Sequence, residues 1–218
     1  MLWGGTPVAI KYSQDVLPPL AVAAIRFALA ALFMLAWCRI VGTGWKLAAG
    51  EFRPCLIAGL LLFVQIGLFH LGLHRSSPSH GSLLINTFVL WVAAIEHFVT
   101  RTDRLSPRRI IGLVIAASGV VMVLTLTQGD DSATAADFDQ PSLIGDLILV
   151  VSGFLLAIKI IYTKQAVRHV PPARLILWHD VVGLSLFAIS SLLFESVIDS
   201  TISETMTPAA TGGLLYQG

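Results

Sequence analysis

The sequence predicts an all-α protein, a polytopic bundle of transmembrane helices arranged as an inverted repeat of five-helix units. Three observations predict it: an apolar composition, a series of long apolar runs, and a pattern of residues that occurs twice. Of the 218 residues, 56% are hydrophobic and 12% are charged, whereas soluble proteins average about 25% charged residues. A water-soluble globule is therefore excluded, and a net charge of +1 leaves no basic surface for nucleic acid.

Six apolar runs are long enough to cross a membrane, because a bilayer core about 30 Å thick requires roughly 20 helical residues. They are Leu20–Ile40, Cys55–Leu73, Gly81–Thr100, Ile110–Thr127, Leu143–Tyr162 and Leu175–Phe194. Two shorter runs, Met1–Ile10 and Ala209–Gly218, each supply about half a span. We interpret them as parts of helices cut by the chain ends, which gives about seven and a half helices of an expected ten.

The distribution of basic residues predicts the orientation of these helices, because short cytoplasmic loops carry the excess of Lys and Arg. Ten of the 14 basic residues follow every second span, and only Lys11 and Arg75 lie in loops on the opposite side. The ten are Arg39, Lys46, Arg53, Arg101, Arg104, Arg108, Arg109, Lys164, Arg168 and Arg174. We therefore expect a multi-pass protein of the cytoplasmic (inner) cell membrane whose first helix runs outwards.

A short pattern occurs twice along the chain. Its two copies consist of Ala9-Ile10-Lys11, Pro18-Pro19 and Arg26, and of Ala157-Ile158-Lys159, Pro171-Pro172 and His179. One copy spans five helices, an odd number, so the second must enter the membrane with opposite polarity. Inverted repeats of this kind characterise secondary transporters. The predicted domains are a first repeat at 1–127 with a truncated first helix, an external linker at 128–142, and an incomplete second repeat at 143–218.

Several segments resemble the EamA-type domain of the drug/metabolite transporter superfamily. They are Trp3-Gly4-Gly5 through Lys11, Pro19 with Arg26-Phe27, Asp103 through Gly112 with Gly119-Val120, and Gly145-Asp146 through Glu195. The resemblance implies a ten-helix carrier with a central cavity lined by helices of both halves, and some members of the family export amino acids or other metabolites. Two positions depart from the family pattern: Asp103 replaces a usual Glu, and Val89 replaces a frequent Pro. We expect the second change to remove a kink from the fourth helix.

Ionisable residues within spans are the first candidates for a substrate site, since burying a charge in a membrane costs roughly 2.5 to 3.5 kcal/mol. Arg26 lies about 10 Å along its helix and Asp180 about 12 Å along its own. Each is expected either to bind substrate or to pair between helices. His179 is a candidate proton relay, but adjacent helical residues point about 100° apart, so at most one of His179 and Asp180 should face a cavity.

Lys11, Lys159 and Asn86 complete the candidate substrate-binding residues. The two lysines occupy matching places in the repeat, although their long side chains could also extend to the membrane surface. Asn86 is the best candidate on a stripe of small and polar residues that either packs against a neighbouring helix or lines the transport path. That stripe consists of Ser82, Asn86, Ala93 and His97.

Other polar and small residues are interpreted as structural. Glu96 is expected to pair with Arg101 or Arg104 at the membrane surface. Gln65 is expected to hydrogen-bond across helices, with a hydrogen bond to substrate as the alternative. Cys38 and Cys55 are interpreted as small packing residues rather than a disulfide. A further set, Gly112, Ala116 and Gly119, is expected to form a face for close helix contact.

The function predicted from these residues is secondary transport of a small polar metabolite, amino acid-like or drug-like, by alternating access. We expect no enzymatic activity and no cofactor, because the sequence has neither a zinc-binding HExxH helix nor a phosphate-binding loop. Protons or another ion as the coupling species, and a homodimer, remain open. The alternatives are a membrane protein without a transport cycle, such as an intramembrane enzyme or a structural subunit, and an inactive fragment of a transporter.

Overall fold

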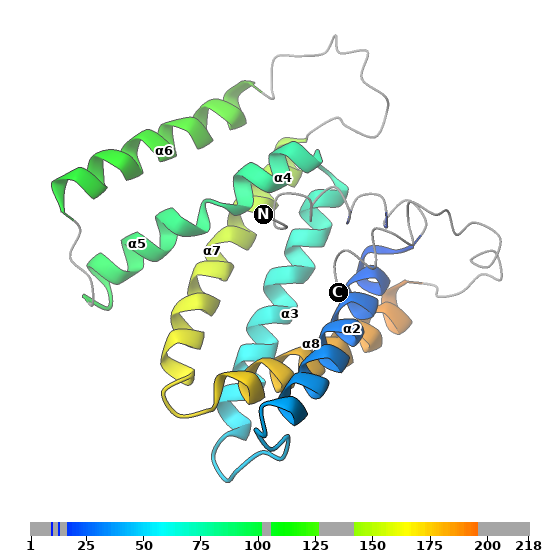
Figure 1. The fold of residues 1–218 in the computed structure, drawn as a ribbon. Coiled ribbons are helices and arrows are strands. Elements are labelled where there is room, and N and C mark those ends of the chain that lie inside the picture. The colour runs from blue at the N-terminus through cyan, green and yellow to red at the C-terminus, as the bar shows by residue number, and fades with distance from the viewer. Residues whose placement is uncertain (1–9, 11–12, 14–16, 102–105, 127–141, 196–218) are drawn as a thin grey trace.

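The computed structural model describes residue 10, residue 13 and the ranges 17–101, 106–126 and 142–195. Within them the chain forms only helices (Figure 1). These are α2 (Pro19–Ile40), α3 (Phe52–His74), α4 (Pro78–Ile85), α5 (Phe88–Phe98), α6 (Pro107–Leu126), α7 (Leu143–Ala166) and α8 (Pro172–Phe194). Counting α4 and α5 as one span, six are long and apolar enough to cross a membrane. The all-α transmembrane bundle is confirmed, whereas Lys11 and Ala209–Gly218 lie outside the described residues.

Proline is the first residue of four of these helices. Its fixed φ angle suits a helix, and its missing N–H costs nothing in the first turn. α2, α4, α6 and α8 start at Pro19, Pro78, Pro107 and Pro172. α7 starts instead with a side-chain cap, because the hydroxyl of Ser142 accepts a hydrogen bond from the backbone N–H of Gly145. Such caps satisfy N–H groups that a helix leaves without partners in its first turn.

The apolar run Gly81–Thr100 is covered by two helices, α4 and α5, rather than by one. α4 ends at Ile85 and α5 begins at Phe88, so the expected loss of a kink at Val89 is wrong. The side chains of Asn86 and Thr87 donate to the carbonyl oxygens of Ser82 and Leu84. Side-chain donors can supply the hydrogen bonds that a broken membrane helix requires. The interruption therefore arises without proline.

α2 and α8 run antiparallel and pack extensively against each other (Figure 1). In its middle, the rings of Phe27 and Phe187 stack with their centroids 5.6 Å apart and an interplanar angle of 4°. At one end, the Glu195 carboxylate accepts hydrogen bonds from the backbone N–H groups of Leu20 and Ala21, at 2.8 and 3.0 Å. An anion at a helix N-terminus is stabilised by the helix dipole, so Glu195 fixes the end of α8 to the start of α2.

α3 packs against both α7 and α8, and close approach of backbones holds it there. Gly145 of α7 lies so near the carbonyl oxygen of Arg75 that a Cβ atom at position 145 would overlap it. Gly59 of α3 similarly leaves room for Val182 of α8, whose Cβ would lie 2.5 Å from an added Cβ. Small residues at helix contacts permit this close packing in membrane proteins.

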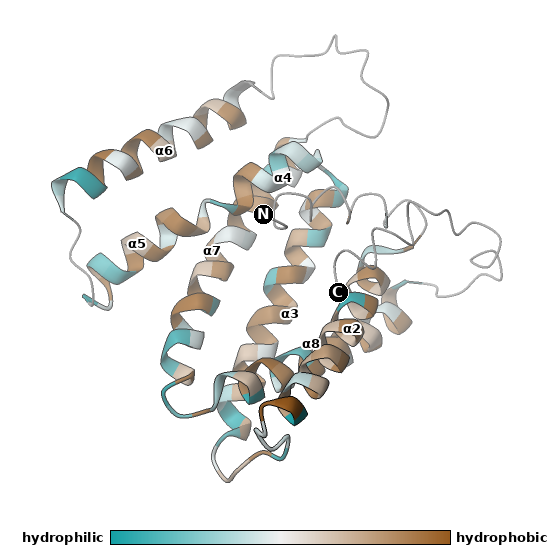
Figure 2. Ribbon diagram, in the orientation of Figure 1, coloured by the Kyte–Doolittle hydropathy of each residue, from teal (hydrophilic) through white to brown (hydrophobic). Residues whose placement is uncertain are grey.

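α5 and α6 are the least covered helices of the bundle. Neither contains a buried residue among those described, and α6 lies beside α5 at one edge (Figure 1). Their surfaces are predominantly hydrophobic, as are most helix surfaces in this protein, while hydrophilic residues concentrate near helix ends and in loops (Figure 2). This distribution is the one expected for helices in contact with lipid.

Candidate substrate site

Three charged groups from three helices interact in the middle of the bundle. The carboxylate of Asp180 on α8 attracts both the guanidinium of Arg26 on α2 and the ammonium of Lys159 on α7. Asp180 is 4% exposed, and Arg26 and Lys159 are partly buried. Buried charges are retained in membranes when they pair with each other or face a polar cavity. The two cations and one anion leave one positive charge in excess.

His179 adds a titratable ring to this cluster. Its Nδ1 atom lies 2.9 Å from Oδ1 of Asp180 and 3.0 Å from the carbonyl oxygen of Ile176. The two adjacent side chains are therefore in contact with each other, and the expectation that at most one of them faces a cavity stays a prediction. This contact lets His179 orient the carboxylate of Asp180.

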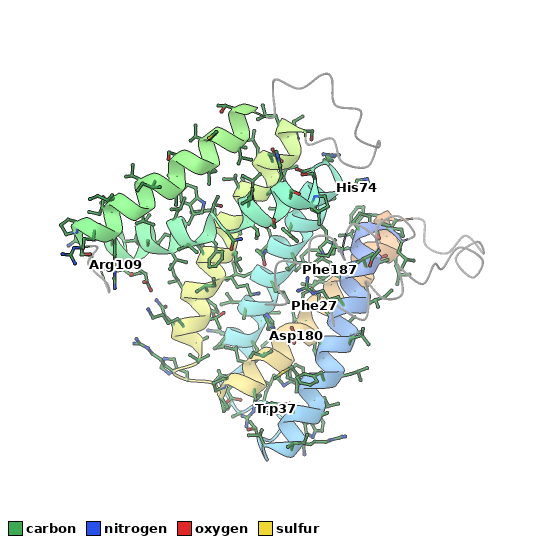
Figure 3. All side chains as sticks on the ribbon, turned by 45° about the horizontal axis from the view of Figure 1, so that its top comes forward. Phe27, Trp37, His74, Arg109, Asp180 and Phe187 are labelled. Atoms are coloured by element: carbon green, nitrogen blue, oxygen red, sulfur yellow. The ribbon has the colours of Figure 1, made fainter. Side chains whose placement is uncertain are left out.

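The α3 helix contributes a buried histidine next to the charge cluster. The imidazole of His70 is fully buried and lies within the electrostatic influence of Arg26. Arg26 also lies over the face of Phe27, with 5.7 Å between the guanidinium carbon and the ring centroid. A cation over an aromatic face is stabilised by the ring quadrupole. Asp180, Phe27 and Phe187 lie in the same part of the bundle in Figure 3.

Asn86 does not belong to this charge cluster. It lines a cavity of about 830 Å³ between α4, α5 and α6, whose lining includes none of Arg26, Lys159, His179 and Asp180. Arg109 at the start of α6 also borders this cavity and lies far from Asp180 in Figure 3. The structure therefore does not bring Asn86 together with the charged candidates, and its substrate-binding role stays a prediction. Lys11 lies outside the described residues.

Two further expectations about the region around α5 and α6 are wrong. The small residues Gly112 and Gly119 make no close helix contact, since an added Cβ at either position would meet nothing within 4 Å. They border the open cavity instead. Glu96 forms an ion pair, but its partner is Lys164 of α7, with 2.7 Å between Oε1 and Nζ, rather than Arg101.

Two interpretations of buried residues agree with the structure. The side-chain amide of Gln65 on α3 donates to the hydroxyl of Ser152 on α7 at 3.3 Å. That hydroxyl donates in turn to the backbone carbonyl oxygen of Gln65 at 2.9 Å. Gln65 thus bonds across helices, as expected. Cys38 and Cys55 are buried free thiols, consistent with packing roles.

The sequence analysis missed a buried polar cluster at the end of the bundle that the charge count assigns to the outside. Asp146, in the first turn of α7, is fully buried. Its carboxylate accepts a hydrogen bond from the hydroxyl of Ser76, and its other oxygen lies 2.8 Å from Nδ1 of His80 on α4. The signal available in the sequence was an acidic residue four positions into a predicted span. We assigned it only to a family motif.

A second missed contact joins the opposite end of the bundle. Glu51, before α3, pairs with Arg174 of α8 at 2.7 Å and accepts a hydrogen bond from the backbone N–H of Ala48. The Ala48 hydrogen bond and then the Arg174 guanidinium hold the pKa of Glu51 below its usual value. The role of Glu51 was hard to predict because a loop sequence does not indicate which distant helix packs against that loop.

The arrangement of Ser76, His80 and Asp146 differs from that of an activated serine nucleophile. Ser76 lies near a His and an Asp, but its hydroxyl donates to the carboxylate of Asp146. A nucleophilic serine requires a base that accepts its proton and is in turn oriented by a third group. The cluster of Arg26, Lys159 and Asp180 instead presents fixed charges of both signs, which can hold a small charged solute.

Comparison with known proteins agrees with this geometry. The EamA-like transporter family matches residues 1–125, more than half of the chain. The transporter YoaV of Bacillus subtilis is 23% identical over 219 residues, covering 100% of this chain and 71% of its own length. A probable amino-acid metabolite efflux pump of Salmonella typhimurium is 25% identical over 230 residues, covering 99% of this chain and 69% of its own.

A solved crystal structure has the same fold, with a TM-score of 0.66 at 17% identity, covering 99% of this chain and 74% of the other. The six apolar helices and the named transporters among its relatives make this a multi-pass protein of the cell membrane. The family match over residues 1–125, which contain four of the six apolar spans, shows that the chain belongs to the EamA-like transporter family.

Proposed function

We propose that this protein is a secondary carrier that moves a small metabolite bearing a carboxylate, such as an amino acid, by alternating access. The observation that supports this most directly is the charge cluster of Arg26, Lys159 and Asp180, contributed by α2, α7 and α8. Its excess positive charge suits a carboxylate, while Asp180 suits an amino group. A relative named as an amino-acid metabolite efflux pump is consistent with this substrate class.

The carrier mechanism requires that the charge cluster lie where two halves of the protein meet. We propose that these halves are the predicted repeats, at 1–127 and 143–218 with the linker at 128–142. The antiparallel pairing of α2 with α8 supports this, since each is the second helix of its repeat. In inverted-repeat carriers the substrate site lies near the membrane midplane at the interface of the repeats. Arg26 and Asp180 are both about 10 to 12 Å from a helix end.

Transport in proteoliposomes tests the proposal. The purified protein is reconstituted and the exchange of a panel of radiolabelled zwitterionic amino acids is measured across the vesicle membrane. We expect Arg26→Ala to reduce exchange by about tenfold or more, equivalent to about 1.4 kcal/mol of lost binding. Arg26→Lys should restore part of the activity, because it keeps the charge.

Arg168→Ala is the matched control. Arg168 is exposed beyond the end of α7, so its removal should leave exchange unchanged. Exchange of no amino acid in the panel, or full activity in Arg26→Ala, would contradict the proposal. In either case the charge cluster would be a structural pairing between helices.

A further inference from the structure

We propose that the cavity between α4, α5 and α6 binds an anionic glycerophospholipid, with the headgroup phosphate at Arg109 and an acyl chain along α6. The cavity lies in a different part of the bundle from the charge cluster (Figure 1), and its lining includes no residue of that cluster. The inference therefore goes beyond the proposed function and does not depend on which solute is transported.

The cavity has the length and the lining of an acyl-chain groove. Its volume is about 830 Å³, and its lining on α6 extends from Arg109 to Val123, which is about 21 Å at 1.5 Å per residue. One leaflet of a bilayer is about 15 Å of hydrocarbon deep, half of the bilayer core. Between these two positions the lining residues of α6 are glycine, alanine, leucine and valine. A lipid tail can therefore lie along the helix without meeting a polar side chain.

α6 packs on the bundle near its C-terminal end and leaves space near its start. Val120, Val123 and Leu124 pack against the apolar cluster that contains Leu84, whereas an added Cβ at Gly112 would meet nothing within 4 Å. Side chains that line an empty space lose dispersion contacts. Because an acyl chain is as apolar as a leucine side chain, a lipid tail restores those contacts without a desolvation cost.

The start of α6 supplies positive charge where the headgroup would lie. Arg109 borders the cavity, and Arg108 lies beside it in the first turn of the helix. Residues 97–109 contain four arginines and one aspartate. The charge count assigns this end of α6 to the cytoplasm, and basic pockets between membrane helices on that side bind anionic headgroups. Charge complementarity therefore favours a lipid with a net negative headgroup.

Among the described residues that border the cavity, the acidic side chain is that of Glu96. Its Oε1 atom lies 2.7 Å from Nζ of Lys164, so this pair is neutral and does not repel a phosphate. The Arg109 guanidinium can donate two parallel hydrogen bonds to phosphate oxygens. Phosphatidylcholine carries the same phosphate together with a quaternary ammonium group, which neighbouring arginines repel. The headgroup charge, and not the tail, should therefore determine which lipid binds.

Native mass spectrometry of the full chain, with equimolar phosphatidylglycerol and phosphatidylcholine, tests the headgroup. The wild type should retain phosphatidylglycerol preferentially. Arg109→Gln should weaken that binding about fivefold, the effect of one arginine at an anionic surface, and Arg109→Lys should bind more strongly than Arg109→Gln. Arg168→Gln is the matched control, because it removes an exposed arginine outside the cavity lining. Equal retention of both lipids, or full binding in Arg109→Gln, would overturn the proposal.

A phosphatidylglycerol with a photoactivatable diazirine in its acyl chain locates the tail. Cross-links should map to residues 88–98 and 107–126, which form α5 and α6. Gly112→Leu places a side chain in the groove and should reduce cross-linking severalfold. Ser118→Leu adds a similar side chain at an exposed position of α6 outside the cavity lining, and it should cross-link like the wild type. Undiminished cross-linking in Gly112→Leu would contradict the site.

Thermal unfolding in detergent separates loss of binding from loss of fold. A ligand that binds the folded state raises Tm, so phosphatidylglycerol should stabilise the wild type and Ser118→Leu but not Gly112→Leu. Without lipid, all three should unfold at similar temperatures. If Gly112→Leu is itself unstable, Ala116→Leu fills the same cavity and decides the question. A dimer that Gly112→Leu abolishes, with no effect of phosphatidylglycerol, would overturn the lipid site and identify a second copy of the chain as the occupant.

Discussion

The two sides of the bundle are held together in different ways. α2, α3, α7 and α8 are joined by a ring stack, by charged groups and by glycines that leave room for a neighbouring helix. On the other side, α5 and α6 have no buried residue among those described and border an open cavity of about 830 Å³. Because lipid is as apolar as a leucine side chain, hydrophobicity alone does not hold membrane helices together. Polar links and close backbone contacts account for the difference.

The largest expected effect comes from a matched pair of glycine substitutions. A Cβ at Gly145 would overlap the backbone of Arg75, whereas one at Gly112 would meet nothing within 4 Å. Gly145→Val should therefore destabilise the protein by about 1 to 3 kcal/mol or more, as overpacking does, and Gly112→Val should have little effect. Thermal unfolding in detergent compares them. Equal losses of stability would show that the two sides are packed alike.

A smaller effect is expected where Glu195 fixes α8 to α2. Glu195→Gln removes the negative charge from a side chain that accepts two hydrogen bonds at the start of α2. We expect the free energy of unfolding to fall by about 1 kcal/mol, as is typical of a lost helix cap. Glu96→Gln on the other side disrupts a pair with Lys164, whose side chain is 56% exposed. Exposed ion pairs contribute about 0 to 1 kcal/mol. A greater loss in Glu96→Gln would reverse the comparison.

The contact between Glu51 and Arg174 should make stability depend on pH. The folded protein holds the pKa of Glu51 below its usual value. Its contribution is therefore present above the ordinary glutamate pKa, about 4.3, and is lost as the pH falls through the lower folded value. Glu51→Gln should reduce stability at neutral pH and flatten the acid side of the stability curve. An unchanged acid dependence in the variant would place the titrating group elsewhere.

The smallest effect is expected at Gln65. Its Oε1 atom is buried and has no hydrogen-bond partner among the described residues, while its Nε2 donates to Ser152 over a long 3.3 Å. The Ser152 hydroxyl would keep its hydrogen bond to the backbone carbonyl of residue 65, so an apolar side chain of similar shape leaves no buried partner unsatisfied. Gln65→Leu should therefore unfold within a few degrees of the wild type. A large loss of stability would mean that the link between α3 and α7 depends on this amide.

The sequence predicted the elements of this fold well because membrane thickness imposes a simple rule on helix length. All six long apolar runs are helices, and the proline positions locate four of their starts. The break at Asn86–Thr87 was not predicted, because we attributed kinks to proline and overlooked side chains that bond to the backbone of the preceding turn.

The candidate site was predicted in part. Arg26, Lys159 and Asp180 were recognisable because a charge deep in an apolar run is costly and therefore conspicuous. The separation of Asn86 from these charged residues was not predicted, because helical spacing shows which residues share a face but not which helix that face meets. The pairs His80–Asp146 and Glu51–Arg174 depend on contacts between segments distant in sequence, so composition and spacing could not reveal them.

The break in the fourth span has a consequence for how this protein is made. Its freed carbonyl groups are satisfied by Asn86 and Thr87 of the same segment, and not by α7, which the ribosome synthesises later. The segment can therefore leave the translocon and enter lipid with its backbone already satisfied, before α7 exists. Replacing Thr87 by valine would remove the hydroxyl donor but keep the hydrogen bond from the backbone N–H of residue 87 to the Leu84 carbonyl, at 3.1 Å, so this variant should still insert with only a modest defect.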